Sequence, residues 1–409
     1  MRNKRESGQA LLPVAFGMVL FGAALGLAID IGYLRYLKRQ LQTAVDSAAI
    51  AAAAEVNYGD YVAAAKADSA TNGFTDGANG VTVTVNNPPT SGPNQGQPGY
   101  VEVLIAKTQP TFFIRIVPGA ATSSTVAARA VAYLGSARGC IYSLKPSPGN
   151  ITIGVVSRRG GGASLNANCS VIDNGDLTLF GRPDNVSASA IGVAGTFSNG
   201  TRSNVTPTPL GAVSASDPLS YLPTQNPGNC DFTNFPPITN GFQTLNPGVY
   251  CGGISITQTA NVTFNPGLYI LMQNGSTNNG LAIGGSGNVN GSGVTFYNGA
   301  NSGSVSITNT GTVSLTAPTS GTYAGILILQ DSNNSHNATV DGGNNPTFQG
   351  ALYFPNLNSI LTIDNIGNNA AYTILVAGSL DIRGNNNVLG NDYSSLSNGS
   401  PIKDAVLVE

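Results

Sequence analysis

The strongest hydrophobic pattern in the chain is an uncharged run of 21 residues, Gln9 to Ile29, close to the N-terminus. At 1.5 Å per residue, a helix of this length crosses the roughly 30 Å hydrocarbon core of a bilayer. The run therefore predicts one transmembrane helix. Apolar residues continue beyond it at helical spacing, which predicts an amphipathic extension to about Val56. They are Ile31, Leu34, Leu41, Val45 and Ala48.

Basic residues precede the apolar run, so the positive-inside rule places the N-terminus in the cytoplasm, although further basic residues follow the run. The first group is Arg2, Lys4 and Arg5, and the second is Arg35, Lys38 and Arg39. A cleaved signal peptide is the alternative, since Gly26 and Ala28 form a small-x-small site, but the run is longer than a signal peptide's apolar region. Gly22 and Gly26 also form a GxxxG step, which predicts a surface for packing against a second helix.

Residues 59–138 combine a short alanine-rich helix from Tyr61 to Ser69 with period-two apolar runs, which are typical of strands. The predicted strands cover 81–85, 100–106, 112–117 and 125–134. The Pro- and Gly-rich stretch Asn86–Gly99 predicts a flexible loop. Lys107 and Arg115 are interpreted as charges on the solvent face. A long helix packed on a small antiparallel sheet would be a pilin-like arrangement.

Beyond Cys140, apolar-polar-apolar triplets recur between Gly and Asn clusters. Examples are Ile254–Ile256, Val262–Phe264, Leu281–Ile283, Val294–Phe296, Val305–Ile307, Val313–Leu315, Leu361–Ile363 and Leu380–Ile382. A triplet in a strand points two side chains inward and one outward, and short strands at this spacing favour a parallel β-helix. Asn246–Tyr250 and Asn265–Tyr269 repeat the pattern NPGxY 19 residues apart, a plausible length for one coil.

These patterns predict a mainly β protein in which a transmembrane, pilin-like long helix with a small antiparallel sheet precedes a parallel β-helix. Three domains are expected. Residues 1–58 hold a cytoplasmic stub, the transmembrane helix and its extension, 59–138 a small pilin-like α+β domain, and 139–409 the β-helix. A Pro-rich insertion at about 203–240 lacks triplets and is interpreted as a lateral loop.

Composition narrows the functional classes. Only 9% of the 409 residues are charged, 52 are Gly and the net charge is -2, which argues against nucleic acid as a partner. Residues 1–150 carry a net charge of +4 and residues 151–409 of -6. No Glu lies between Glu102 and Glu409, so amphipathic helices are not expected in the second half. His336 is the single histidine, which disfavours His-based metal and triad chemistry.

All four cysteines lie beyond the apolar run, at Cys140, Cys169, Cys230 and Cys251. In an oxidising compartment, the pairing Cys140 with Cys169 and Cys230 with Cys251 is favoured, since the second pair is 21 residues apart, close to one coil. Buried free thiols are the alternative. No CxxC motif is present, so a redox motif or zinc ribbon is not expected.

An enzyme on this scaffold would need two facing carboxylates. The candidates are Asp173 with Asp176, and Asp331 with Asp341 near His336, but isolated Asp in Gly- and Asn-rich turns is usually a turn former. The glycine-rich segment Arg158–Gly162 has no following Lys-Ser/Thr and is interpreted as an exposed turn rather than a phosphate loop. No catalytic, cofactor-binding or metal site is predicted.

The N-terminal segment resembles the TadE/TadG-like proteins of the tight-adherence (Flp) pilus system. The resemblance rests on SGQA at 7–10, the apolar run, DIGYL at 30–34 and LQTAVDSAA at 41–49. Processed prepilins carry a Glu five residues after the cleavage glycine, where this chain has Pro13 after Gly8. The similarity therefore implies the TadG branch, which stays anchored in the membrane.

The sequence thus predicts a single-pass protein of the cytoplasmic membrane whose C-terminal domain lies in the periplasm or outside the cell. The resemblance implies a role in pilus assembly or surface adhesion, with other pilus assembly proteins and the bilayer as partners and surface polysaccharide as a candidate ligand. A binding face would use the outward side chains of the triplets, such as Thr263, Thr295 and Thr362. The alternatives are a polysaccharide-active β-helical enzyme and a minor filament subunit.

Overall fold

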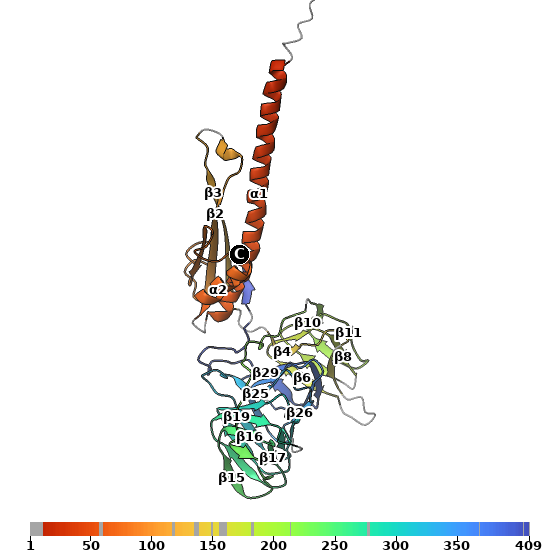
Figure 1. Ribbon diagram of the computed structural model, residues 1–409. Helices are drawn as coiled ribbons and strands as arrows, with labels where there is room; N and C mark the ends of the chain where they lie inside the picture. Colours follow the sequence, from red (N-terminus) through yellow and green to blue (C-terminus); the bar gives the residue numbers. More distant parts are fainter. Residues whose placement is uncertain are drawn as a thin grey trace, which may run out of the picture. The chain divides into compact units, whose positions relative to one another are not determined.

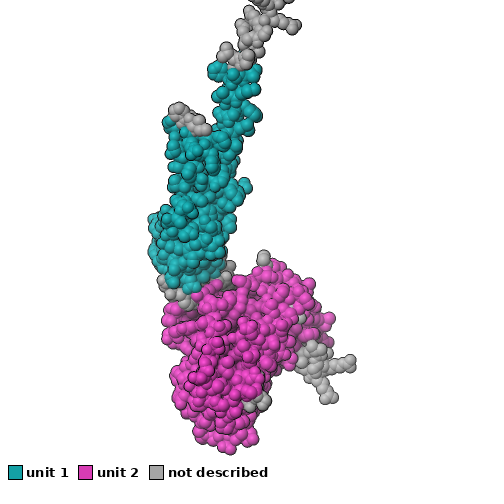
Figure 2. Space-filling model, viewed as in Figure 1, with its two compact units in different colours: residues 1–135, 404–409 teal, residues 136–403 magenta. Residues whose placement is uncertain are grey.

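The computed structural model describes residues 11–56, 60–116, 119–134, 139–148, 150–154, 162–180, 184–212, 214–275, 279–367, 369–403 and 405–408. The chain forms two compact units (Figures 1 and 2). Unit 1 comprises residues 1–135 and 404–409, and unit 2 comprises residues 136–403. The expected division into three domains differs from this one, because the predicted helix and α+β domains share one core and the last residues of the chain return to it.

Unit 1 contains α1 (Leu11–Glu55), α2 (Tyr61–Thr71) and a four-stranded antiparallel sheet. The strand order is β1 (Val81–Asn86), β2 (Tyr100–Pro110), β3 (Ser123–Leu134) and β32 (Ala405–Leu407). The predicted long helix is confirmed over residues 11–55, and the strands predicted at 81–85, 100–106 and 125–134 are present.

The core of unit 1 lies between the C-terminal half of α1 and one face of the sheet. Leu41 and Val45 of α1 are fully buried together with Val101, Val103 and Ile105 of β2. Ala residues fill the same helix face from residue 44 to 53, so the helix backbone approaches the sheet closely. The alternation of buried and exposed residues at the start of β1 follows the period-two pattern of its sequence, whereas β2 also buries Glu102 between Val101 and Val103.

Residues 112–116, predicted as part of a strand at 112–117, instead lie at the tip of the β2–β3 hairpin, and residue 117 is outside the described residues. After β2 ends at Pro110, the chain makes a single 3-10 turn, η1 (Ile114–Ile116), before β3 begins. Figure 1 shows this hairpin running alongside α1. The apolar residues of the tip therefore do not enter the sheet, and the helix is their neighbour.

Strand β32 ends the chain inside unit 1. It pairs antiparallel with β3, with Tyr133 opposite Val406. All of unit 2 is consequently inserted, in sequence, between two neighbouring strands of one sheet. The three residues of β32 are too short a run to predict this return from the sequence.

The described strands of unit 2 lie in three sheets, and the strands within each sheet pair in parallel. The main path of the largest sheet has the order β13 (Leu210–Gly211), β10 (Ile191–Val193), β7 (Ser170–Asp173), β4 (Gly139–Ser143), β29 (Thr373–Ala377), β27 (Thr347–Phe354), β25 (Ile326–Gln330), β22 (Val294–Asn298), β19 (Gly267–Met272), β16 (Gly248–Cys251) and β14 (Phe232–Thr233). A branch of the same sheet joins it at β27 and contains β24 (Val313–Thr316), β21 (Val289–Ser292), β18 (Asn261–Phe264) and β15 (Phe242–Leu245).

The second sheet has the order β11 (Phe197–Ser198), β8 (Asp176–Leu179), β5 (Asn150–Ile153), β30 (Ser379–Arg383), β28 (Ile360–Asp364), β26 (Ala338–Asp341), β23 (Val305–Thr308), β20 (Leu281–Ile283) and β17 (Ile254–Ile256). The third has the order β12 (Asn204–Thr206), β9 (Asn185–Ser187), β6 (Ser164–Ala167) and β31 (Asn387–Leu389). Most neighbouring strands in these sheets are two or three strands apart along the chain, so the chain leaves a sheet face and returns to it beside an earlier strand.

The chain does not build these sheets from one end to the other. It enters at β4 in the middle of the largest sheet and proceeds through β7 and β10 to β13 at one end. It then resumes at β14, at the opposite end, and returns strand by strand to β29, which pairs with β4. The neighbouring sheets close in the same way, since β30 pairs with β5 and β31 with β6.

Residues 212–231, a Pro-rich crossing segment, connect the two ends of the largest sheet. Ten strand spacings of about 4.8 Å separate β13 from β14, a distance that an extended chain of this length covers. Leu219 and Leu222 are buried against the core, and Asp217 accepts a hydrogen bond of 2.6 Å from the Tyr353 hydroxyl. The predicted insertion at 203–240 therefore differs from a lateral loop, because it begins and ends in strands and is bonded to the sheets between them.

The triplets have the side-chain arrangement that was predicted. Both apolar residues are buried in all eight triplets, and the middle residue is exposed or partly exposed in seven of them. The exception is Thr295, which is 1% exposed and donates a hydrogen bond of 2.8 Å to the Ile326 carbonyl. The NPGxY repeat is also structural, since the hydroxyls of Tyr250 and Tyr269 each donate to the carbonyl of the Asn that begins their motif.

Candidate functional site

The N-terminal part of α1 is an apolar surface that the described residues of the protein leave largely uncovered. Phe16, Met18, Val19, Leu20 and Phe21 are exposed by 67–71%. From Leu37 onward the same helix is buried in the core of unit 1. The helix is long and apolar enough to cross a membrane, so it suggests a single-pass membrane anchor.

Asp30 joins this helix to the tip of the β2–β3 hairpin. Its side chain is 2% exposed and accepts hydrogen bonds from three consecutive backbone amides, those of Phe112 at 2.9 Å, Phe113 at 2.9 Å and Ile114 at 2.7 Å. Tyr33 lies one turn further along α1 and packs edge-to-face on Phe112, with ring centroids 5.4 Å apart. Asp30, the acidic residue that follows the apolar run, thus holds the hairpin tip against α1. The sequence did not indicate this role.

The two glycines of the GxxxG step have different surroundings. A Cβ atom at Gly22 would meet nothing within 4 Å, whereas one at Gly26 would lie 2.8 Å from the Cβ of Phe113. Within unit 1, therefore, Gly26 provides the space for the hairpin tip. The surface at Gly26 that was expected to pack against a second helix is covered by a residue of the same chain.

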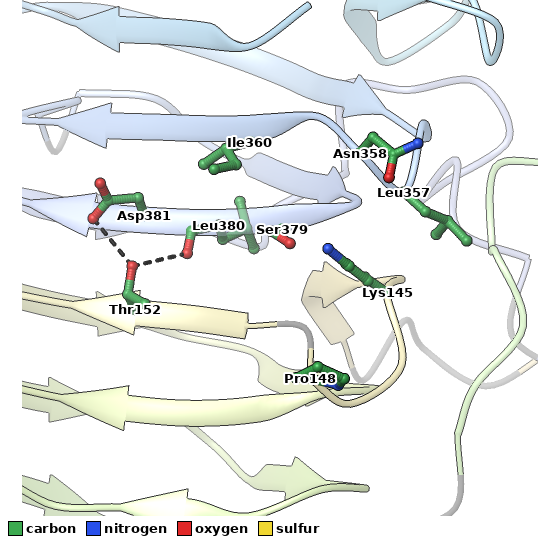
Figure 3. Close-up of a pocket in the computed structure, with 9 residues that line it drawn as sticks. All are labelled: Lys145, Pro148, Thr152, Leu357, Asn358, Ile360, Ser379, Leu380 and Asp381. Carbon is green, nitrogen blue, oxygen red and sulfur yellow. Dashed lines mark hydrogen bonds between the residues drawn. The ribbon is translucent and has the colours of Figure 1, made fainter. Parts of the chain in front are cut away.

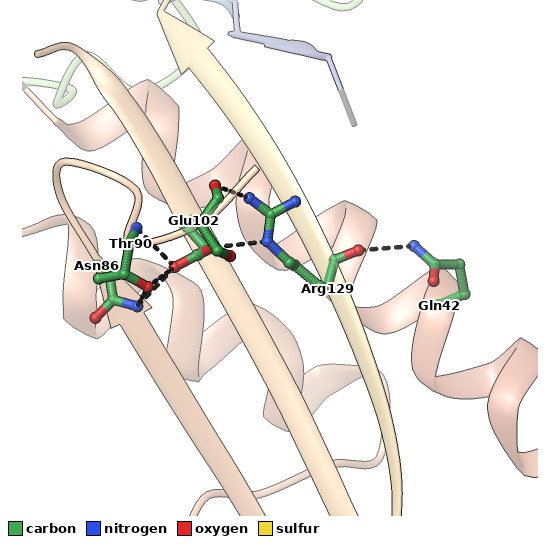
Figure 4. Close-up of polar contacts among 6 residues, drawn as sticks. Gln42, Asn86, Thr90, Glu102 and Arg129 are labelled. Carbon is green, nitrogen blue, oxygen red and sulfur yellow. Dashed lines mark hydrogen bonds and ion pairs between the residues drawn. The ribbon is translucent and has the colours of Figure 1, made fainter. Parts of the chain in front are cut away.

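Glu102 is the most heavily bonded carboxylate in unit 1 (Figure 4). It is fully buried and accepts hydrogen bonds from Asn86, Ser91 and both the amide and hydroxyl of Thr90, and it pairs with Arg129 at 2.6 Å. Burial alone would raise the pKa of the Glu102 carboxyl, but the hydrogen bonds that these neighbours donate lower it to about 2. The loop at 86–99, expected to be flexible, is thereby tied to the sheet at Thr90 and Ser91.

Of the two charges interpreted as lying on the solvent face, Arg115 is exposed and Lys107 is partly exposed. The Lys107 ammonium lies over the ring of Phe74, 5.7 Å from its centroid. Lys66 and Asp76 form an exposed ion pair at 2.9 Å. None of these groups is gathered with a nucleophile or a second carboxylate.

In unit 2, Asp173 and Asp176 have opposite electrostatic environments. Asp173 is 1% exposed, and its Oδ2 atom has no hydrogen-bond partner, so burial raises the pKa of its carboxyl to about 6. The backbone amide and hydroxyl of Thr196 donate to Asp176, which lowers the pKa of that carboxyl. The pair does not form two acids facing a common substrate position, because Asp173 is buried and Asp176 is bonded to Thr196 and Ser147 from two other segments of the chain.

We expect that Asp173→Asn makes unit 2 more stable at neutral pH. A folded-state pKa raised from 3.8 to about 6 means that stability is highest below pH 3.8 and falls as the pH rises to 6. The ionised carboxylate then costs about 3 kcal/mol, and the neutral amide avoids most of this cost. Urea denaturation near pH 4 and above neutrality would show a gain only at the higher pH. Asp176→Asn is the control and should destabilise, because its pKa shift has the opposite sign; the idea fails if both variants behave alike.

The second group of candidate acids also serves turns. Asp331 accepts hydrogen bonds from the backbone amide and side chain of Asn333, and Asp341 accepts one from the amide of Gly343. The Tyr297 hydroxyl donates to Asp331 at 2.5 Å, and His336 is bonded to Asn334. In the described structure, no bond connects Asp331, Asp341 and His336 to one another. Most of the segment Arg158–Gly162 lies outside the described residues.

Hollows on the surface of unit 2 are shallow and chemically mixed. One of about 230 Å³ lies where β5 meets β30, and Figure 3 shows its lining. Thr152 donates to Asp381 at 3.2 Å, Lys145 supplies a cation, and Ile360 and Leu357 are partly exposed at its edge. Asp381 is also paired with Arg383. Among the described residues, no three His, Cys, Asp or Glu side chains are grouped to hold a metal ion.

The outward faces of the sheets are the larger surfaces. Thr263 on β18 and Thr362 on β28 lie in different sheets, and Thr295 on β22 is buried, so the three residues do not form one binding surface. The branch from β15 to β24 does present a continuous row, because Thr244, Thr263 and Asn290 are opposite one another in register, followed by Ser314. Two adjoining hollows on this face share Thr263 and Asn290, and no charged residue lines either.

The cysteines are joined as the sequence favoured, Cys140 with Cys169 and Cys230 with Cys251. Cys140 lies on β4 and Cys169 immediately before its neighbour β7, while Cys251 ends β16, the neighbour of β14. Each bridge therefore connects adjacent strands of the largest sheet, one near its middle and one near its end.

Comparison with known proteins bears on the first part of the chain. The family model described as Flp pilus-assembly TadE/G-like matches residues 8–55, the segment that contains α1 and the Asp30 motif. No curated protein and no solved structure matches the chain. Residues 8–55 are thus similar to a TadE/G-like Flp pilus-assembly domain, and together with the apolar helix this similarity fits a membrane-anchored, pilus-associated protein.

Proposed function

We propose that this protein is a single-pass component of the cytoplasmic membrane in a Flp-type pilus system, related to the TadG branch. The match of residues 8–55 to the TadE/G-like family is the observation that carries the proposal. Pro13 stands where processed prepilins have Glu, which supports an anchored protein rather than a processed pilin. Basic residues at positions 2, 4 and 5 support an N-terminus in the cytoplasm.

The exported location of unit 2 is supported by its cysteines. Both bridges lie beyond the helix, and disulfides persist in the periplasm and on cell surfaces but are rare in the cytosol. The low content of charged residues supports a structural or binding role. Its partners would be other pilus proteins and the bilayer.

We further propose that unit 2 is a parallel β-helix. Successive strands mostly visit three faces in turn, namely the main path of the largest sheet, the second sheet, and either the branch or the third sheet. A strand pairs in parallel with an earlier one on the same face, for example Leu281 with Val305, 24 residues later. Stacking of coils would also explain why the apolar residues of the triplets are buried in both of the larger sheets. The chain enters this β-helix in the middle of the stack of coils rather than at one end, and we call this order permuted. Its first and last coils are therefore neighbours, and β4 pairs with β29 there.

A role in assembly or adhesion fits the surface chemistry better than catalysis. The uncharged row of Thr, Asn and Ser on the β15–β24 face offers many weak hydrogen bonds to a polysaccharide or a partner protein, so affinity would come from area and avidity. The candidate acids of a polysaccharide-active enzyme are bonded in turns. A filament subunit would need the helix surface at Gly26 to pack on other copies, and Phe113 occupies it.

The anchor is tested by Leu20→Arg, at a position exposed near the middle of the apolar run. Placing Arg there is expected to cost about 2.5 to 3.5 kcal/mol on insertion, so the protein should be depleted from the membrane fraction and extracted by alkaline carbonate. Leu20→Phe keeps an apolar side chain and should behave as the parent. Cells would be separated into cytoplasmic membrane, outer membrane and sheared filaments, and the amount of each variant in each fraction would be measured. Equal recovery of Leu20→Arg in the cytoplasmic membrane would count against the proposal.

A further inference from the structure

The tip of the β2–β3 hairpin lies at the level where α1 leaves its apolar run. Phe113 packs on Gly26, three residues before the end of the run, and Phe112 packs on Tyr33, four residues after it. At 1.5 Å per residue, and with the bilayer centred near Val19, Gly26 lies about 10 Å and Tyr33 about 21 Å from the centre. The hydrocarbon core ends at about 15 Å. The tip therefore spans the boundary between acyl chains and headgroups.

The side chains of the tip suit that boundary. Phe112 and Phe113 remain 47% and 43% exposed although each contacts the helix. The exposed parts of both rings lie at the same depth as exposed apolar residues of α1. Aromatic rings are favoured at membrane interfaces. Arg115, also exposed, adds a cation that can bind a lipid phosphate.

Three backbone amides of the tip are hydrogen-bonded within the protein, as a site with little water requires. An unbonded amide in the hydrocarbon region costs several kcal/mol, which normally keeps loops out of lipid. Here the carboxylate of Asp30 accepts from three consecutive amides of the tip, those of Phe112, Phe113 and Ile114. The same three bonds satisfy the buried carboxylate, so neither partner depends on water.

We propose that the hairpin tip is a second membrane contact, in which Phe112 and Phe113 enter the interfacial lipid beside α1 while Asp30 holds their backbone. This proposal rests on the anchor proposed above. Two contacts at different points of unit 1 would fix its tilt and rotation against the bilayer, which a single helix leaves free. The occupant of this apolar surface is therefore lipid rather than a second protein.

The chain contains no Trp, so single Trp substitutions report their own surroundings without background. We would prepare Phe112→Trp and Phe113→Trp in the full chain, reconstituted in vesicles of phosphatidylethanolamine and phosphatidylglycerol. Part of the lipid would carry bromine on the acyl chains, which quenches Trp only on close contact. Both variants should show emission shifted to shorter wavelength and at least about twofold quenching by the brominated lipid, with protection from aqueous iodide.

Two further variants separate the possible outcomes. Phe21→Trp lies inside the apolar run and should be quenched if the anchor is in the bilayer, whereas Val62→Trp, on α2 at the other end of the core, should respond to iodide only. Quenching at Phe21 but at neither tip position would overturn this inference and leave the anchor intact. Absence of quenching at Phe21 would overturn both. Circular dichroism and the mapped disulfides would verify that each variant is folded.

Discussion

Replacing Glu102 with Gln is expected to lower the free energy of unfolding of unit 1 by about 3 to 5 kcal/mol, the typical cost of breaking a buried ion pair. Gln at this position leaves the Arg129 guanidinium, 25% exposed, without its carboxylate. It also loses an acceptor oxygen that binds the loop at Thr90 and Asn86. The loop and the outer face of the sheet should therefore loosen together.

Hydrogen exchange of the full chain in lipid measures this effect in unit 1 alone. Protection of the amides in β1, β2 and β3 should fall by about two to four powers of ten, while the strands of unit 2 keep theirs. Lys66→Met is the matched control, because it breaks an exposed ion pair with Asp76 and should cost less than about 1 kcal/mol. A Glu102→Gln variant as well protected as Lys66→Met would show that the buried network contributes little.

The same carboxylate makes unit 1 sensitive to acid. Its pKa is lowered from 4.5 to about 2, so its contribution is fully present above pH 4.5 and is lost as the pH falls to 2. This loss amounts to about 3 kcal/mol. Glu102→Gln should lack the acid-dependent step, which distinguishes the carboxylate from a general effect of low pH on the protein.

The sequence predicted most of unit 1 because its signals are local. An uncharged run, a helical spacing of apolar residues and three period-two runs suffice to place α1, β1, β2 and β3. The tip at 112–116 was mistaken for a strand because FFIRI is as apolar as a strand. Its conformation depends on Asp30, which is more than 80 residues away in the sequence. Glu102 was missed for the same reason, since its partners come from a loop and from β3.

For unit 2, the sequence predicted the inward and outward faces but not the order of the strands. Triplets such as Leu380–Ile382 fix which side chains are buried, and this alternation is local. Which strands pair with each other depends on which coils are neighbours in the stack. Ile141 and Leu375 lie opposite each other although 234 residues separate them, and nothing in either residue indicates this pairing. The Pro-rich segment was the sequence feature that could indicate this strand order. It lacks triplets and is long enough to cross the sheet, so the chain can continue at the opposite end.

Loss of the two disulfides is expected to be the other large effect. Bridges that close loops of 29 and 21 residues should each contribute about 3 to 4 kcal/mol by restricting the unfolded chain. Cys140→Ala with Cys169→Ala removes the bridge between β4 and β7, beside the pairing of β4 with β29 at which the chain closes on itself. That variant should lower the urea midpoint of unit 2, and so should reduction of the parent protein.

Mass mapping of the purified protein without reduction should first show the two intramolecular links, Cys140 with Cys169 and Cys230 with Cys251. The Cys230→Ala, Cys251→Ala variant is a useful comparison, because its bridge lies near the end of the sheet, where β14 has β16 as its one neighbour among the described strands. We expect it to loosen β14 and the adjoining crossing segment locally, whereas loss of Cys140–Cys169 should affect exchange on both sides of the β4–β29 pairing. Four alkylatable thiols in protein taken from the cell envelope, or equal local effects of the two variants, would contradict the permuted arrangement and the exported location on which this prediction is based.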